Sequence, residues 1–255
     1  MYMVKIPGRL EDFGQWPIDG AEEREHETWI YFSSRLVASG FAKSHGSKVE
    51  RAQWEVNLDY QKSWRAAPLG QRWWLVPAWD PTPAPAGRFT LKMNGGLVFG
   101  AGDHETTRAC LEILEELPVA GARVFDLGTG TGILSEAAVL LGAKSAIGCD
   151  LEWDATVMAQ QRRVPAFQGP SFAVRGDTFD VLLVNIPGYA HLDLTAEYGR
   201  LLVPGGLLLL SGYYEWQSAR IEEALPQFTK QRQIVRGDGW VAAIFSHATA
   251  TPSSA

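Results

Sequence analysis

An apolar run that ends in an aspartate is followed by three glycines at alternate positions in the stretch VFDLGTGTGILS, which begins at Val124. Asp126 stands two residues before the first of these glycines, Gly128, Gly130 and Gly132. Glycine permits a sharp turn after a strand, and its missing side chain lets a ligand approach the backbone at the start of the next helix. The spacing therefore predicts a loop that binds a small polar ligand.

Details of this loop distinguish between cofactors. A dinucleotide fingerprint would require Gly or Ala at the position of Ile133. Instead, a second acid, Asp150, ends the next apolar run. A carboxylate there can accept hydrogen bonds from both ribose hydroxyls of an adenosine, and Asp126 can meet a cationic amino acid group directly or through water. The pattern predicts S-adenosylmethionine rather than NAD or FAD; the alternative is that these residues only form a turn and end two strands.

The elements that position these residues alternate between strands and helices. Strands are expected at 123–126, 144–150, 180–186 and 205–212, helices at 131–143, 154–163, 195–203 and 217–225, and two closing apolar runs around 231–235 and 240–245. Alternation of this kind predicts a largely parallel sheet with helices on both faces, and runs such as VLLV and LLLL fit strands that are buried on both sides. The predicted fold class is α/β, a Rossmann-like doubly wound sheet, whose ligands bind beyond the carboxyl ends of the strands.

The composition changes along the chain and indicates domain boundaries. Short strands at Tyr2–Ile6 and Thr28–Phe32 predict a small α/β unit, the segment from Asn57 to Arg65 has helical character, and PAWDPTPAPAGR is too rich in proline for a helix or a central strand. We therefore assign residues 1–55 to an N-terminal α/β domain, 56–88 to a linker helix and proline-rich connector, 89–248 to the large domain, and 249–255 to a disordered tail.

The bulk properties exclude several classes of protein. The 255 residues carry a formal net charge of −6 with 46% hydrophobic residues, and there is no long Lys/Arg run, so direct nucleic acid binding is not expected. No signal peptide or membrane-spanning run is recognised, which predicts a cytoplasmic protein, and a monomer is expected. Cys110 and Cys149 have no metal or disulfide spacing, so no metal site is expected. Seven acids against one arginine between Glu11 and Glu27 favour a solvated face over a docking surface for a basic partner.

Four segments resemble the PrmA family, the methyltransferases that trimethylate the large-subunit ribosomal protein L-eleven. They are GLVFGAGDHETTRACLEIL (96–114), VFDLGTGTGILSEAAVLLGA (124–143), VNI (184–186) and LLVPGGLLLLSG (201–212). NLDYQKSW and RWWLVPAW also resemble that family's interdomain helix and the entry to its catalytic domain, so the resemblance covers about residues 55 to 245. The FGxGxHxTT pattern is specific, whereas the glycine loop is common to enzymes that use S-adenosylmethionine.

The resemblance implies a class I S-adenosylmethionine-dependent methyltransferase whose FGxGxHxTT segment lies over the cofactor pocket and whose N-terminal unit captures the ribosomal protein. On the residues alone, His104 could instead stand at a helix entrance and Thr106 and Thr107 could cap that helix. This chain departs from the family pattern at Ala101, where threonine is usual, and has a shorter stretch from Asp150 to Asn185. The predicted cofactor-binding residues are Phe99, Gly100, His104, Thr106, Thr107, Asp126, Gly128, Thr129, Gly130, Gly132, Asp150 and Asn185.

NIPGY, residues 185–189, resembles with substitutions the N/D-P-P-Y/F element of enzymes that methylate nitrogen. An amide oxygen and a nearby backbone carbonyl can accept the hydrogens of a neutral amine and direct its lone pair at the methyl carbon. Asn185 is therefore the predicted catalytic residue, and the alternative is a simple strand-ending turn at Pro187 and Gly188. Three functions stay open: an N-methyltransferase for lysine or N-terminal amines of a ribosomal protein L-eleven-type substrate, a methyltransferase for another protein or small amine, and a non-catalytic S-adenosylmethionine-binding protein.

Overall fold

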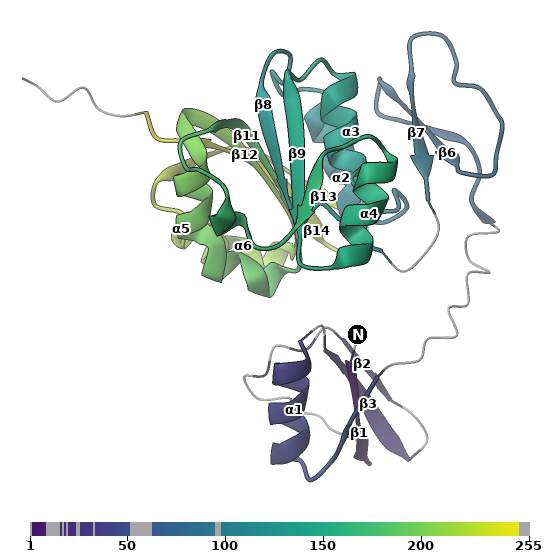
Figure 1. The fold of residues 1–255 in the computed structure, drawn as a ribbon, viewed down its shortest axis with the longest axis vertical. Helices are drawn as coiled ribbons and strands as arrows, with labels where there is room; N and C mark the ends of the chain where they lie inside the picture. The colour runs from purple at the N-terminus through teal and green to yellow at the C-terminus, as the bar shows by residue number, and fades with distance from the viewer. Residues whose placement is uncertain are drawn as a thin grey trace, which may run out of the picture. The chain divides into compact units, whose positions relative to one another are not determined.

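The computed structural model describes residues 2–8, 16, 18, 20–23, 26–32, 34–51, 63–94 and 98–249. The chain divides into two compact units, residues 1–57 and 58–255, both drawn in Figure 1. Most of the linker helix expected between Asn57 and Arg65, and nearly all of the expected tail, lie outside the described residues.

The N-terminal unit is a small antiparallel sheet with one helix. Its strands are β1 (Tyr2–Pro7), β2 (Gly20–Glu23), β3 (Glu27–Phe32) and β4 (Val49–Arg51), in the order β2-β3-β1-β4, and its helix is α1 (Arg35–Ser44). Val4 lies opposite Ile30 in the β1–β3 register, and both are fully buried against Phe41 of α1. The two strands expected in this unit are present as β1 and β3.

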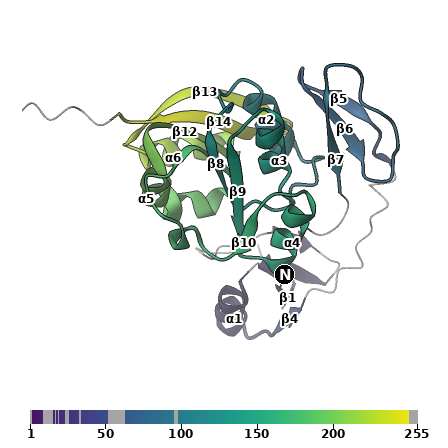
Figure 2. The same ribbon diagram turned by 45° about the horizontal axis from the view of Figure 1, so that its top comes forward.

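A seven-stranded sheet forms the centre of the larger unit in the part of the chain that the structure describes (Figure 2). Its order is β10-β9-β8-β11-β12-β14-β13, and neighbours from β10 to β12 pair in parallel, whereas β14 is antiparallel to both β12 and β13. The strands are β8 (Arg123–Leu127), β9 (Ser145–Asp150), β10 (Ala166–Gln168), β11 (Phe179–Asn185), β12 (Leu202–Tyr214), β13 (Phe228–Arg236) and β14 (Trp240–His247). The predicted Rossmann-like doubly wound class is confirmed.

Helices cover both faces of this sheet, and the strands alternate between the two cores. Val181 and Leu183 of β11 pack into the core shared with α2 and α3, whereas Leu182 and Val184 pack into the core shared with α5 and α6. This alternation explains why the strand sequences are continuously apolar rather than alternating with polar residues. The helices are α2 (Glu105–Leu114), α3 (Ile133–Leu140), α4 (Trp153–Gln161), α5 (His191–Leu201) and α6 (Ser218–Glu223), with single 3-10 turns η2 (Ser171–Ala173), η3 (Gly188–Ala190) and η4 (Glu215–Gln217).

A second, three-stranded sheet precedes the large one and differs from the sequence expectation. β6 (Trp73–Pro77) pairs antiparallel with β5 (Ala67–Leu69) and parallel with β7 (Phe89–Met93). Trp73 is fully buried in the same core as α2 and donates its indole N–H to the Leu111 carbonyl at 2.7 Å. The range 56–88, expected to be only a linker helix and connector, therefore contains two strands of a packed sheet, and its proline-rich stretch is the loop between β6 and β7.

Candidate functional site

The strand register brings the predicted site residues to one edge of the sheet. Leu127, the last residue of β8, lies opposite Cys149 of β9 and Val184 of β11. Asp150 and Asn185 follow these partners directly and end their strands, so both lie at the same level as the start of the glycine loop. The chain switches from one side of β8 to the other at this edge, which is the position where ligands bind in doubly wound sheets.

The glycine loop has no room for a side chain at any of its three glycines, and the approach of a neighbouring segment is closest at Gly128 and Gly130. Gly128 and Gly130 have backbone φ angles of +72° and +53°, in the left-handed region that favours glycine. A Cβ at Gly128 would lie 2.3 Å from the Ile186 side chain, and a Cβ at Gly130 would lie 2.4 Å from the Phe99 carbonyl oxygen. Both glycines are therefore required by conformation and by close approach of a neighbouring segment.

Asp126 lies beneath this loop and holds its shape. Its side chain is 1% exposed, and one carboxylate oxygen accepts hydrogen bonds from the hydroxyls of Thr129 and Ser135, each at 2.8 Å. Burial raises the pKa of Asp126 to about 6, because desolvation disfavours the charged form more than the two hydroxyls favour it. The carboxylate thus ties the loop to the first turn of α3, and its expected contact with a cationic ligand group stays a prediction.

Asp150 lies at the same edge and is partly exposed. One of its oxygens accepts the backbone N–H of Gly130 at 2.9 Å, and the other accepts the N–H of Glu152 at 3.0 Å. A carboxylate offers about four acceptor sites, so both oxygens retain capacity for further donors. Asp150 therefore stabilises the loop and can still accept hydrogen bonds from a pair of hydroxyl groups.

The FGxG segment lies directly against the glycine loop. The Phe99 carbonyl accepts the N–H of Thr131 at 3.0 Å, and the Gly100 carbonyl accepts the Thr131 hydroxyl. The Phe99 side chain is 51% exposed, which is unusual for a ring of this size. The structure thus brings together the two motifs that the sequence presents 25 residues apart, and the expected contact of the FGxG segment with the cofactor stays a prediction.

The HxTT part of that motif begins α2. His104 is the N-cap residue, and its Nδ1 accepts the backbone N–H of Thr106 at 3.3 Å, so the helix-entrance alternative describes its geometry. Partial burial lowers the pKa of His104, and its ring lies edge-on to Trp240 with the centroids 5.0 Å apart. Thr106 and Thr107 are both fully buried, and the Thr107 hydroxyl points to β11 rather than serving as the cap.

Asn185 is the buried polar group at the centre of this edge. Its side-chain Nδ2 lies 3.5 Å from the hydroxyl of Thr107, and its residue is 7% exposed. Its Oδ1 is buried without a hydrogen-bond partner in the described protein. Because buried acceptors in native proteins are nearly always satisfied, this oxygen is suited to accept an N–H or O–H from a bound molecule.

Two groups of site residues are not predicted from the sequence. The first is the pair of hydroxyl residues Thr131 and Ser135, which stand inside and just after the glycine loop; a hydroxyl side chain at these positions is the signal that could have identified them. The second group is aromatic: Tyr214 and Trp240 are cross-strand partners on β12 and β14, and their rings stack with centroids 3.9 Å apart. No spacing in the sequence predicts this aromatic pair, because the two rings meet only through the antiparallel pairing of strands that are distant in the sequence.

The comparisons with known proteins decide the family. The family model of ribosomal protein L11 methyltransferase (PrmA) matches residues 20–248. The chain belongs to this family. A PrmA relative from Pseudomonas fluorescens (strain SBW25), a ribosomal protein L11 methyltransferase, is 33% identical over 217 residues, which cover 81% of this chain and 72% of the relative. The crystal structure of a ribosomal protein L11 methylase from Lactobacillus delbrueckii subsp. bulgaricus superposes with a TM-score of 0.66 at 27% identity and covers 72% of this chain and 100% of that chain.

Membership of the PrmA family confirms the resemblance found in the motifs. It makes this chain an S-adenosylmethionine-dependent methyltransferase, as predicted from the glycine loop and Asp150. Within the described ranges, no helix is long and apolar enough to cross a membrane. The same residues contain no group of three or more His, Cys, Asp and Glu side chains that could hold a metal ion.

Proposed function

We propose that this methyltransferase transfers methyl groups from S-adenosylmethionine to amino groups of a ribosomal protein L11-type substrate. Its PrmA relatives are named for that substrate, and 81% of the chain aligns with them. The observation that carries the proposal within the site is the buried, unpartnered Oδ1 of Asn185 at the carboxyl end of β11. A hydrogen-bond acceptor at this position can orient a neutral amine for methyl transfer.

The residues of the site fit the cofactor. The Asp150 carboxylate has acceptor capacity for the ribose hydroxyls, and the three glycines of the loop, Gly128, Gly130 and Gly132, carry no side chains of their own that would keep a ligand from its backbone. When bound, S-adenosylmethionine supplies a methyl group that its sulfonium has already activated. The protein is left to place the cofactor, exclude water and orient the amine.

Asn185 orients the amine in this proposal. A lysine amine is mostly protonated near neutral pH and must first lose a proton to solvent. The Asn185 Oδ1 then accepts one of the two remaining hydrogens, which fixes the direction of the nitrogen lone pair. The amide stays in place because its Nδ2 lies beside Thr107 and because Pro187 and η3 follow at once.

The test is turnover of Asn185→Ala on purified ribosomal protein L11 with saturating cofactor. We expect at least a tenfold lower kcat, since about 1.4 kcal/mol of lost orientation already gives that factor, and nearly unchanged affinity for S-adenosylmethionine. Gln231→Ala removes an exposed amide on β13 and serves as the control. Equal kcat in the wild type and Asn185→Ala would remove Asn185 from the mechanism, and cofactor binding by the wild type without methylation of any amine would favour a non-catalytic binding protein.

The N-terminal unit, residues 1–57, completes the proposal as the part that captures the protein substrate. Its support is that it forms a compact unit with a core of its own. Deletion of residues 1–57 is expected to preserve cofactor binding and to raise KM for ribosomal protein L11; an unchanged KM would remove the unit from substrate capture. A ribosomal protein substrate also places the enzyme in the cytoplasm.

A further inference from the structure

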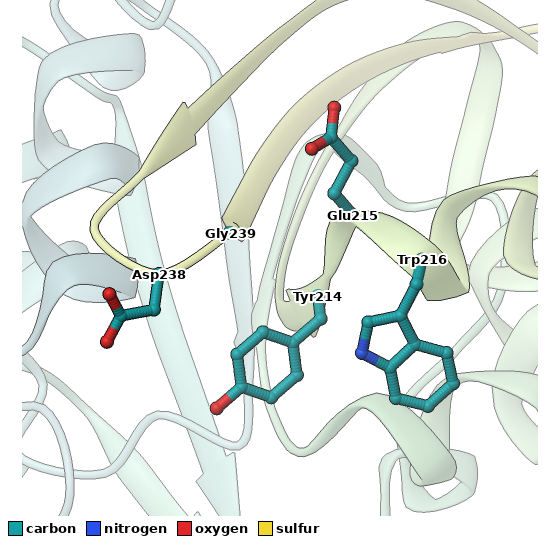
Figure 3. A pocket seen from close by; sticks show the side chains of 5 residues that line it. All are labelled: Tyr214, Glu215, Trp216, Asp238 and Gly239. Atoms are coloured by element: carbon teal, nitrogen blue, oxygen red, sulfur yellow. The ribbon is translucent and has the colours of Figure 1, made fainter.

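A hollow of about 370 Å³ opens where the end of β12 meets the turn between β13 and β14. Tyr214, Glu215, Trp216, Asp238 and Gly239 line it (Figure 3). The Glu215 N–H donates to the Gly239 carbonyl at 2.8 Å and joins the two sides of the hollow. We refer to it below as the aromatic–acidic hollow.

Two aromatic rings form one wall of this hollow and are nearly parallel. The rings of Tyr214 and Trp216 have an interplanar angle of 13° with centroids 6.5 Å apart, and Tyr214 stacks on Trp240 behind it. Trp216 is 79% exposed, although burying an indole would release a large apolar area from water. Trp216 thus presents an exposed indole beside the partly buried ring of Tyr214, and an indole that stays in water is available to a partner.

Two acidic residues, Glu215 and Asp238, also line the hollow, and neither forms an ion pair within the part of the chain that the structure describes. Figure 3 shows the Glu215 carboxylate directed away from the rings of Tyr214 and Trp216, so Asp238 is the acid that can act together with the rings. No lysine or arginine lines it. Aromatic faces and carboxylates both attract cations, the rings through their quadrupoles and the acids through their charge. The chemistry of the hollow therefore selects an ammonium or guanidinium group.

The hollow is connected to the methyl-transfer edge through direct contacts. Trp240 touches His104, which in turn touches Phe99 of the FGxG segment, with ring centroids 5.0 and 5.2 Å apart. On the other side, Gly188 of the NIPGY turn packs so closely on Gln217 of η4 that a Cβ there would lie 2.7 Å from its amide oxygen. Asn185 lies opposite Ser211 of β12, and Tyr214 ends the same strand, so the aromatic–acidic hollow lies at the sheet edge that carries Asn185.

We propose that the aromatic–acidic hollow binds a second, positively charged side chain of the protein substrate, a lysine or arginine near the methylated residue. The proposal rests on the proposed function, in which the acceptor is a protein amine. It makes Trp216 and Asp238 determinants of substrate specificity that do not touch the cofactor. The formal net charge of −6 also favours a basic partner over an acidic one.

The kinetic test compares Trp216→Ala and Asp238→Asn with the wild type on ribosomal protein L11. We expect KM to rise roughly five- to thirtyfold in each, the scale of a partly desolvated cation–aromatic contact, with kcat within about twofold and cofactor affinity unchanged. Trp79→Ala, which removes another exposed tryptophan, and Glu223→Gln on α6 are the controls and should keep the wild-type KM. Wild-type KM in the hollow variants would overturn the proposal.

A binding test separates this proposal from the choice of substrate. Nα-acetyl-lysine amide is titrated into the full-length protein while the indole N–H signal of Trp216, assigned by its loss in Trp216→Ala, is followed by NMR. We expect a saturable shift with the lysine amide that is at least fivefold weaker in Asp238→Asn, and little shift with the neutral Nα-acetyl-norleucine amide. No shift, or an equal shift with norleucine amide, would overturn the hollow; a lysine-specific shift without methylation of ribosomal protein L11 would support the hollow and overturn the proposed acceptor.

Discussion

Asp150 accepts the backbone N–H of Gly130 at 2.9 Å, a hydrogen bond that joins the end of β9 to the middle of the glycine loop. The same carboxylate accepts the N–H of Glu152 at the entrance to α4. One side chain thus fixes the loop and the helix that follows β9, and it also offers the acceptors that ribose hydroxyls require. Its removal is expected to affect the cofactor more than the fold.

The first prediction concerns Asp150→Ala. The ribose hydroxyls lose a charged acceptor, so affinity for S-adenosylmethionine should fall by about 1.5–3 kcal/mol, or roughly 10- to 150-fold. Isothermal titration calorimetry measures the change, with Glu223→Gln on α6 as the control for removal of a surface carboxylate. Unchanged affinity in Asp150→Ala would mean that the ribose binds elsewhere.

The second prediction concerns Gly130→Ala. Alanine at a φ of +53° is strained, and its Cβ would lie 2.4 Å from the Phe99 carbonyl oxygen, so the FGxG segment must move. We expect a loss of about 2–4 kcal/mol in the free energy of unfolding and at least tenfold weaker cofactor binding.

Gly121→Ala is the matched control for this substitution. Gly121 also has a left-handed φ, +77°, but nothing lies within 4 Å of its Cβ position. It should therefore show only the backbone strain, about 1–2 kcal/mol, and wild-type affinity. Equal effects of the two substitutions on both quantities would show that close approach of Phe99 is unimportant.

The loop and its strands could be predicted because their signals are local. The apolar run that ends in Asp126 and the glycines after it dictate a strand and a turn whatever the rest of the fold does. The start of α5 differs from the expectation: the helix begins at His191, four residues before the expected start at residue 195, because it follows the η3 turn directly and has no capping side chain.

The features that could not be predicted depend on long-range pairing. Tyr214 and Trp240 meet only because β12 and β14 run antiparallel in one particular register. The strand β6 could not be predicted for the same reason. Trp73 and its neighbours stand next to a proline-rich stretch that indicates a loop, and they pair with β7 on the far side of that loop. The proline-rich composition correctly predicts the loop, but it does not predict the sheet whose strands the loop connects.

The third prediction concerns the pH dependence of stability through His191. The imidazole is fully buried, with its Nε2 2.9 Å from the Ser211 carbonyl and its Nδ1 2.9 Å from the Tyr198 hydroxyl. A neutral ring satisfies both partners, since Nε2–H donates to the carbonyl and Nδ1 accepts the phenol proton. Burial lowers the pKa of His191 to about 4, from an ordinary value near 6.5.

His191 makes the folded protein less stable at low pH. Between pH 6.5 and 4 the unfolded chain binds a proton on His191 while the folded protein keeps the ring neutral. The contribution of His191 to the free energy of unfolding is therefore complete above pH 6.5 and is lost as the pH falls. The loss amounts to roughly 3 kcal/mol over that window. Asp126 acts in the opposite direction, because its pKa is raised to about 6 and its contribution is lost as the pH rises from about 4 to 6.

These opposed contributions make the wild type less sensitive to pH than either group alone, and substitutions should separate them. The free energy of unfolding of His191→Gln should lie furthest below that of the wild type at pH 7, and the difference should shrink toward pH 4.5, because only the wild type loses stability when His191 of the unfolded chain is protonated. Asp126→Asn should become more stable relative to the wild type as the pH rises from 4.5 to 7, because only the wild type must ionise the buried Asp126. Urea unfolding at several pH values measures both differences, and a pH-independent difference for His191→Gln would show that this histidine is not held neutral in the folded protein.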